Sequence, residues 1–294
     1  MSQIATTPVQ TQVARIRSPF AFRLRRGKGR GKLYVGTLIV GAIAVLAIFS
    51  RVIAPFDPIT QDLTSQFLPP SHAHLFGTDQ FGRDVFSRAV YAASLDLQIA
   101  FLGTLFCMLL GVSIGVVAGY FGGIVDLIAG RLIDVVTAIP GIVAIIALIA
   151  ALGSSMLNLY IALAVTGWTA YARLARGEVI AAKNLQYVQA SRALGYTNRR
   201  IVLRHILPNV ITPPLLFWIT DMVGTVLLVT ALSYLGLGPQ PPTPEWGAMI
   251  SEAQPFMLMA WWVPLFPGLG IVIAGIGLGL LGDGLADFLR PEVG

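Results

Sequence analysis

Charged side chains are scarce in this 294-residue chain: Asp, Glu, Lys and Arg together make up only 12% of it. A soluble globular domain carries about 25% charged residues. Here 55% of the residues are hydrophobic and the mean hydropathy is +0.76. This composition excludes a water-soluble globular protein and indicates a chain that is solvated by lipid.

The chain also has little cysteine and no evident set of metal-binding or catalytic residues. Cys107 is the single cysteine, so no intrachain disulfide is expected. His72 and His74 form a His-x-His pair without a third ligand nearby, so we expect no metal site. No Ser, His and Asp set can be assembled by spacing. The sequence therefore predicts a protein without its own catalytic site.

Long uncharged runs predict membrane spans, because a spanning helix needs roughly 20 apolar residues. The runs are Leu33–Ser50, Leu97–Val125, Val135–Ala172, Met222–Pro244 and Ala253–Gly282. The third is too long for one span, so we expect it to fold back at Gly153, Ser154 and Ser155. An all-α polytopic protein results, with six spans predicted at residues 33–54, 96–120, 127–151, 156–175, 210–236 and 264–283.

The positions of Lys and Arg predict the orientation, because cytoplasmic segments retain positive charge. Basic residues gather in the tail, residues 1–32, and in the loop after the fourth span, residues 177–209. The loops 55–94 and 237–263 carry acidic residues and are expected outside. Both chain ends, including residues 291–294, are therefore predicted to be cytoplasmic. The retention of positive charge on the cytoplasmic side accounts for the basic residues, so we expect no nucleic-acid partner.

Glycine patterns inside the apolar runs predict helix packing. Gly277, Gly279 and Gly282 spell G-x-G-x-x-G, but no strand precedes them, so a dinucleotide site is not expected. Small residues recur every four positions at Gly111, Gly115 and Gly119 and again at Gly275 and Gly279. Such stripes let backbones approach closely, so both spans are expected to pack against protein. The spacing leaves open whether that protein is this chain or a partner.

Asp221 is the one acidic residue deep inside a predicted span. Ionisable residues at such depth usually face a pore or a partner. Two interpretations remain open: Asp221 faces a translocation path, or it lies at the interface near the start of the fifth span.

The loop from Glu178 to Pro208 has a helical pattern of its own. Tyr187, Ala190, Ser191 and Leu194 fall on one stripe, and Gly195 offers a left-handed stop. Thr197 or Asn198 can cap a second short helix that Pro208 is expected to end. The small centre of the stripe favours docking into a groove of another protein. The alternative is an ordinary helix resting on lipid head groups.

The sequence YVQASRALGYTNRRIVLRHILPNV, residues 187–210, closely resembles the EAA loop of ATP-binding-cassette importer permeases of the dipeptide and oligopeptide family. Gln189, Ala190 and Ser191 occupy the E-A-A places, with Gln and Ser as departures from the pattern. Two further segments also resemble the family, HLFGTDQFGRDVFSRAVYAASL at 74–95 and LSYLGLGPQPPTPEWGAMISEA at 232–253. The likeness runs from about residue 53 to residue 291.

This resemblance implies the type I importer fold, with a five-helix core over residues 95–290 behind the first span. It implies three kinds of partner besides membrane lipid: a second related permease, a pair of cytoplasmic ATPases that bind the ATP and Mg, and an external solute-binding protein. The residues expected to couple to the ATPases are Tyr187, Gln189, Ala190, Ser191, Leu194 and Gly195. Those expected at the external entrance are Asp79, Arg83, Asp84 and Trp246.

The function predicted on this basis is one half of the pore of an ATP-driven peptide importer in the bacterial or archaeal inner membrane. Glutathione, nickel chelates, opines and sugars remain alternative cargoes on the same scaffold. A secondary transporter is a further alternative, but that class places coupling ionisable residues near mid-bilayer in both halves, and this sequence offers one Asp.

Overall fold

The computed structural model describes residues 30–289, and the basic tail up to residue 29 and the last residues, 290–294, lie outside them. Helices dominate the described residues, in which β structure is limited to one isolated bridge between Thr78 and Asp84. The longer helices are α1 (Arg30–Ile48), α3 (Val85–Phe121), α4 (Gly123–Thr137), α5 (Gly141–Leu152), α6 (Met156–Ala182), α10 (Thr212–Tyr234) and α12 (Trp262–Leu289). Shorter ones are α2 (Ser50–Ile53), α7 (Gln186–Ala193), α8 (Asn198–Ile201), α9 (Leu207–Val210) and α11 (Trp246–Ala253).

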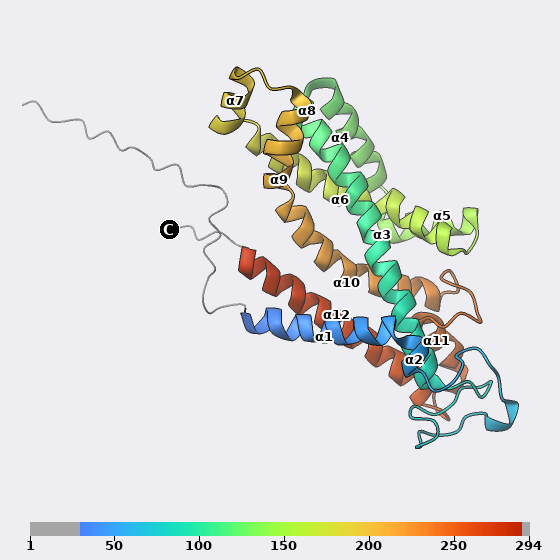
Figure 1. Cartoon of the computed structure of the whole chain (residues 1–294). Coiled ribbons are helices and arrows are strands. Elements are labelled where there is room, and N and C mark those ends of the chain that lie inside the picture. The colour runs from blue at the N-terminus through green and yellow to red at the C-terminus, as the bar shows by residue number, and fades with distance from the viewer. Residues whose placement is uncertain (1–29, 290–294) are drawn as a thin grey trace, which may run out of the picture.

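The connections lie at two opposite ends of the molecule. Figure 1 shows the segment between α2 and α3 beside α11 at one end, whereas α7 and α8 lie at the other. The long helices run between these ends, and α3 is the longest. With 37 residues, α3 extends about 55 Å at 1.5 Å per residue, well beyond a hydrocarbon core of about 30 Å.

Helix α3 packs along α6 through the predicted glycine stripe. A Cβ atom on Gly111 would lie 2.3 Å from the Trp168 carbonyl oxygen, and one on Gly115 would lie 2.4 Å from that of Ala172. Gly119 has the same relation to Arg176, at 2.9 Å. The prediction of close packing is confirmed for this stripe, and the neighbour is in the same chain.

The glycines of α12 differ in how closely this chain approaches them. Gly279 has no neighbouring atom within 4 Å of an added Cβ, and Gly275 meets only a Val223 methyl group at 3.9 Å. Close approach occurs instead at Gly277 and Gly284, which face α1. Within this chain the close packing of α12 therefore uses the row of Gly277 and Gly284, and packing of Gly275 and Gly279 against a partner stays a prediction.

The predicted number of spans is not fully confirmed. Four helices are long and apolar enough to cross a membrane, namely α1, α3, α10 and α12, and α4 with α5 makes a fifth candidate, bent by 82°. Pro140 lies at this bend, where its ring blocks a continuous helix. Helix α6 has 27 residues but is not among these candidates, since Asn158, Arg173 and Arg176 dilute its apolar character.

Local signals at helix ends agree with the structure. Gly153 has φ +91° at the end of α5, and the Ser155 hydroxyl accepts a hydrogen bond from the Asn158 N–H as α6 begins, which confirms the predicted turn. The external loop was predicted to extend to residue 94, but α3 begins at Val85. Asp84 caps it by accepting a hydrogen bond from the Ser87 N–H.

Candidate functional site

The segment before α3 folds back on itself through two glycines with positive φ. Gly77 has φ +73° and Gly82 has φ +70°. A Cβ atom on Gly82 would lie 1.8 Å from the Asp62 carbonyl oxygen, so only glycine fits there. These turns place Asp79, Arg83 and Asp84 side by side at the start of α3, and the His74 ring reaches Asp84 at 3.0 Å.

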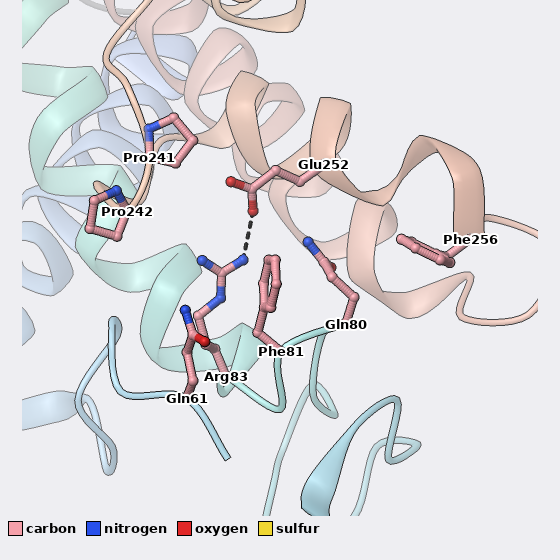
Figure 2. Close-up of a pocket in the computed structure, with 8 residues that line it drawn as sticks. All are labelled: Gln61, Gln80, Phe81, Arg83, Pro241, Pro242, Glu252 and Phe256. Carbon is pink, nitrogen blue, oxygen red and sulfur yellow. Dashed lines mark hydrogen bonds and ion pairs between the residues drawn. The ribbon is translucent and has the colours of Figure 1, made fainter. Parts of the chain in front are cut away.

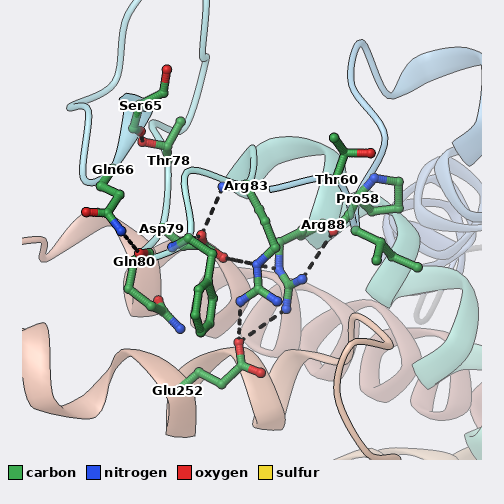
Figure 3. A network of polar contacts seen from close by, with 12 residues as sticks. Pro58, Thr60, Ser65, Gln66, Thr78, Asp79, Gln80, Arg83, Arg88 and Glu252 are labelled. Carbon is green, nitrogen blue, oxygen red and sulfur yellow. Dashed lines mark hydrogen bonds and ion pairs between the residues drawn. The ribbon is translucent and has the colours of Figure 1, made fainter. Parts of the chain in front are cut away.

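Two arginines and two carboxylates form a buried ionic network at this end of the molecule (Figure 3). Arg83 Nε donates to Asp79 Oδ2 at 2.6 Å, and Arg83 Nη2 donates to Glu252 Oε2 of α11 at 2.6 Å. Arg88 Nη2 lies 3.4 Å from the same Glu252 oxygen, and its Nη1 donates to the Pro58 carbonyl at 3.1 Å. Buried charges need such pairing, so the network fastens α11 to α3 and to the preceding loop.

A pocket of about 680 Å³ opens above this network (Figure 2). Figure 2 shows the Arg83 guanidinium paired with Glu252. The pair lies between the aromatic ring of Phe81 and two prolines of the loop 237–263, Pro241 and Pro242. The lining residues are Gln61, Gln80, Phe81, Arg83, Pro241, Pro242, Glu252 and Phe256. The pocket is thus built by the two segments that were predicted to be external, and charged groups and apolar rings both line it.

The four predicted entrance residues are buried. Asp79, Arg83, Asp84 and Trp246 are each at most 3% exposed, and of these only Arg83 lines the pocket. Trp246 donates its indole N–H to the Ala89 carbonyl at 3.0 Å and packs against Gly270, where an added Cβ would lie 2.8 Å from the ring. These residues therefore lie beneath the surface at this end of the molecule, and their role at an entrance stays a prediction.

Sequence reasoning missed Arg88 and Glu252 as members of the network. Arg88 lies in the loop 55–94 and Glu252 in the loop 237–263, both predicted to be external, but neither was predicted to pair. No local pattern marks this pairing, because Glu252 lies 164 residues after Arg88 and only the fold brings the two together.

His72 and His74 do not form a metal centre in the described part of the chain, where no group of three or more His, Cys, Asp or Glu side chains is placed to hold an ion. The His74 ring stacks on Phe56, with ring centroids 4.7 Å apart, and its Nδ1 is engaged by Asp84.

Asp221 lies near the middle of α10 and is half-buried. The Tyr171 hydroxyl of α6 donates to Asp221 Oδ2 at 2.7 Å. One turn earlier, Trp218 donates its indole N–H to the Thr104 hydroxyl of α3 at 2.8 Å. Asp221 is therefore part of a polar contact between spans, and its predicted place on a translocation path stays a prediction.

The predicted coupling segment, residues 185–210, lies at the opposite end of the molecule from the pocket. Within α7, Tyr187, Gln189, Ala190 and the following Leu194 are exposed, Leu194 to 71%. Ser191 is only 6% exposed and donates its hydroxyl to the Tyr187 carbonyl at 2.8 Å. Three members of the predicted stripe thus face outward, and Ser191 lies on the inner side.

The turn after α7 forms as its residues predict. Gly195 has φ +75°, and the Thr197 hydroxyl accepts the Arg200 N–H at the start of α8. The segment is anchored by Asn198, whose Oδ1 accepts a hydrogen bond from the Tyr120 hydroxyl of α3 at 2.7 Å.

The predicted role of Pro208 was wrong. Pro208 lies in the first turn of α9 instead of ending a helix. A short π-helical turn, Val202–Ile206, precedes it, and the Leu207 N–H bonds to the Val202 carbonyl. A π turn widens the helix locally, which relieves the clash between a proline ring and the carbonyl four residues earlier.

Comparison with known families adds a match over most of the chain. Residues 111–294 match the family described as "Binding-protein-dependent transport system inner membrane component". The chain is 37% identical to the dipeptide transport system permease protein of Alkalihalophilus pseudofirmus, covering 94% of this chain and 91% of that one. It is 36% identical to the glutathione transport system permease protein of Pectobacterium atrosepticum, covering 99% and 97%.

A solved structure shares the fold. It is the MetNI methionine ABC transporter in inward-facing conformations, with a TM-score of 0.50 and 18% identity, over 70% of this chain and 97% of the matched chain. At this level of identity the likeness concerns the arrangement of helices alone.

Proposed function

Because this chain belongs to the family of binding-protein-dependent transport system inner membrane components and is a permease subunit of an ABC importer, we propose that its cargo is short peptides. The observation that carries the proposal is the likeness, at 37% identity over 94% of the chain, to a permease named for dipeptide transport. A probable D,D-dipeptide permease of Escherichia coli K12 is 36% identical over 91% of this chain.

Glutathione is the second candidate cargo. It is favoured by the permease of Pectobacterium atrosepticum, which is named for glutathione and aligns with nearly the whole chain. Glutathione is itself a tripeptide, so both candidates share amide groups and terminal charges. In such systems the external binding protein does most of the selecting, and this chain supplies the path.

The assembly we propose pairs this chain with a second related permease, so that each supplies half of the translocation pathway. Two cytoplasmic ATPases bind and hydrolyse ATP with Mg, and this chain carries no ATPase site of its own. They dock on the exposed face of α7 around Tyr187, Ala190 and Leu194. Gly195 directs α8 back to the spans, so the coupling segment moves as one lever.

We further propose that the pocket over the ionic network faces the external binding protein and that the coupling segment faces the cytoplasm. The basic residues of the loop 177–209 support this orientation through the retention of positive charge on the cytoplasmic side. Both chain ends are then cytoplasmic. Asp221 lies between the two ends and is a candidate for the wall of the pathway.

Reconstitution into proteoliposomes with the partner permease, the ATPases and the binding protein tests the proposal. We expect a labelled dipeptide to be taken up only in the presence of ATP. Unlabelled dipeptides should reduce this uptake more than glutathione does. Uptake of glutathione in preference to dipeptides would favour the second candidate. Uptake driven by an ion gradient without ATP would contradict the importer mechanism.

A further inference from the structure

Two carboxyl side chains that are remote in sequence are buried together at the external end. Asp96 of α3 is 3% exposed, and Glu245, which immediately precedes α11, is fully buried. Neither takes part in an ion pair within residues 30–289. Acidic groups are almost never fully buried without a partner, so the pair requires an explanation of its own.

Three successive backbone N–H groups at the start of α11 point at this pair. The Trp246 N–H donates to Asp96 Oδ2 at 3.1 Å. The N–H groups of Gly247 and Ala248 donate to the two oxygens of Glu245 at 3.0 and 2.7 Å. Both Glu245 oxygens are thereby occupied, whereas Asp96 keeps one oxygen that no backbone group engages.

The two carboxyl groups lie within hydrogen-bonding reach of each other. An ionised carboxylate only accepts hydrogen bonds, so a bond between two carboxyl groups needs a proton on one of them. Because both Glu245 oxygens accept backbone N–H groups, the donor is the Asp96 oxygen that remains.

The surroundings support one negative charge and not two. A helix N-terminus carries roughly half a positive charge, which favours a single carboxylate. From α10 the neutral Ser233 hydroxyl faces Glu245. The nearby arginines of α3 and its preceding loop, Arg88 and Arg83, are engaged by Asp79 and Glu252. A second buried charge would lack a counterion, which is costly.

We propose that Asp96 and Glu245 form a proton-binding site in which Asp96 keeps its proton at neutral pH and donates it to the Glu245 carboxylate. The proton holds the start of α11 against α3, and it thereby fixes the position of the loop 237–263, which contains α11. Removal of the proton leaves two like charges in contact and loosens α11.

The direction of the pH dependence follows from the pair as a unit, since the two carboxyl groups share one proton and burial raises the pKa of Glu245 above its ordinary value. A pair that holds a proton more tightly in the folded state than in the unfolded chain stabilises the fold while that proton is bound. The stabilising effect is therefore lost as the pH rises far enough to remove the shared proton. We expect α11 to become less protected in alkaline solution.

The test uses the full-length chain in lipid nanodiscs and three variants. Asp96→Asn mimics the protonated state, since its amide oxygen accepts from Trp246 and its NH2 donates to Glu245. Glu245→Gln loses an acceptor for the N–H groups of Gly247 and Ala248. Asp134→Asn removes an exposed carboxyl of α4 and is the control.

We expect the thermal midpoint of the wild type and of Asp134→Asn to fall from mildly acidic to alkaline pH. The midpoint of Asp96→Asn should vary less with pH, and that of Glu245→Gln should be lower throughout. In infrared spectra at neutral pH, the carbonyl band of a protonated aspartic acid, identified by labelling aspartate with an isotope, should be weaker in Asp96→Asn than in the wild type.

Two results would overturn the proposal: an unchanged band in Asp96→Asn, or a midpoint that follows pH as steeply in Asp96→Asn as in the wild type. If Asp96→Asn does not fold, infrared titration of the Asp221→Asn variant, which keeps Asp96, tests the proposal instead. A protonated aspartate that disappears in the alkaline range supports the site. Absence of a protonated aspartate at neutral pH contradicts it.

Discussion

At the scale of single residues, Gly82 shows how two separate constraints act on one position. Its backbone has φ +70°, and an added Cβ would lie 1.8 Å from the Asp62 carbonyl oxygen. Gly123 has a similar φ of +55° but open space around it. The two positions therefore separate the effect of backbone conformation from the effect of crowding.

We expect Gly123→Ala to lower the free energy of unfolding by about 1–2 kcal/mol, the cost of a left-handed conformation with a Cβ. Gly82→Ala should cost more, because the loop around Asp79 and Arg83 must also move. Denaturant unfolding of the two variants in detergent measures the difference. Equal losses in the free energy of unfolding would show that the loop can move without weakening the ionic network.

The sequence predicted single residues well where the backbone alone decides. The turns at Gly153 and Gly195 and the cap at Thr197 depend on neighbours in sequence and were correct. Pro208 was misplaced, since its effect depended on a π turn that forms earlier in the chain. The ionic network joins Arg83 and Arg88 to Glu252 of α11, and a pairing over that distance leaves no local pattern.

At the scale of elements, the contact between α3 and α6 depends on the absence of side chains at three glycines. A Cβ on Gly115 would lie 2.4 Å from the Ala172 carbonyl oxygen, whereas Gly130 of α4 has no neighbour within 4 Å. The first glycine is thus required by packing and the second is not.

Gly115→Ala is therefore expected to push the two helices apart and to lower the thermal midpoint. Gly130→Ala, the matched control, should be neutral or stabilising by about 0.5–1 kcal/mol, because alanine favours helix more than glycine does. Thermal unfolding by circular dichroism compares them. A larger loss in Gly130→Ala would contradict the assignment of the packed face.

The coupling segment allows a second test at this scale. Gly195 has φ +75° and open space around it, so only backbone conformation restricts the residue. Gly195→Val should redirect α8 and reduce both co-purification with the ATPases and ATP-driven uptake. Gly195→Asn should retain most of both, since asparagine tolerates the left-handed region. Equal loss in the two variants would mean that the segment needs glycine for another reason.

At the scale of the whole molecule, the pocket and the coupling segment lie at opposite ends, which makes the proposed orientation testable. Leu258 is fully exposed near the pocket end, and Arg199 is exposed in the coupling segment. The native Cys107 is buried and should not react. A membrane-impermeant maleimide should label Leu258→Cys in intact cells and Arg199→Cys only after permeabilisation. The reverse pattern would invert the topology.

The overall architecture was accessible from composition and periodicity, and the count of spans was less so. Apolar runs located α1, α3, α10 and α12, because lipid demands such runs of any exposed helix. The runs could not reveal the 82° bend between α4 and α5 or the polar character of α6. The bend lies at Pro140 inside an uncharged run, and α6 is excluded by the hydropathy that Asn158, Arg173 and Arg176 lower, whereas the runs were defined by the absence of charge alone.

The length of α3 has a further consequence for its register. The helix carries Asp96 and Arg88 towards the pocket end and Tyr120, which binds Asn198, at the other. Each added residue would rotate one end relative to the other by about 100°, given 3.6 residues per turn. Insertion of one residue near Gly111 would therefore turn one set of contacts away from its partners. Insertion of seven residues, close to two full turns, would restore the direction of the side chains but would lengthen the helix by about 10 Å. Insertions and deletions in α3 should be tolerated in steps of whole turns or not at all.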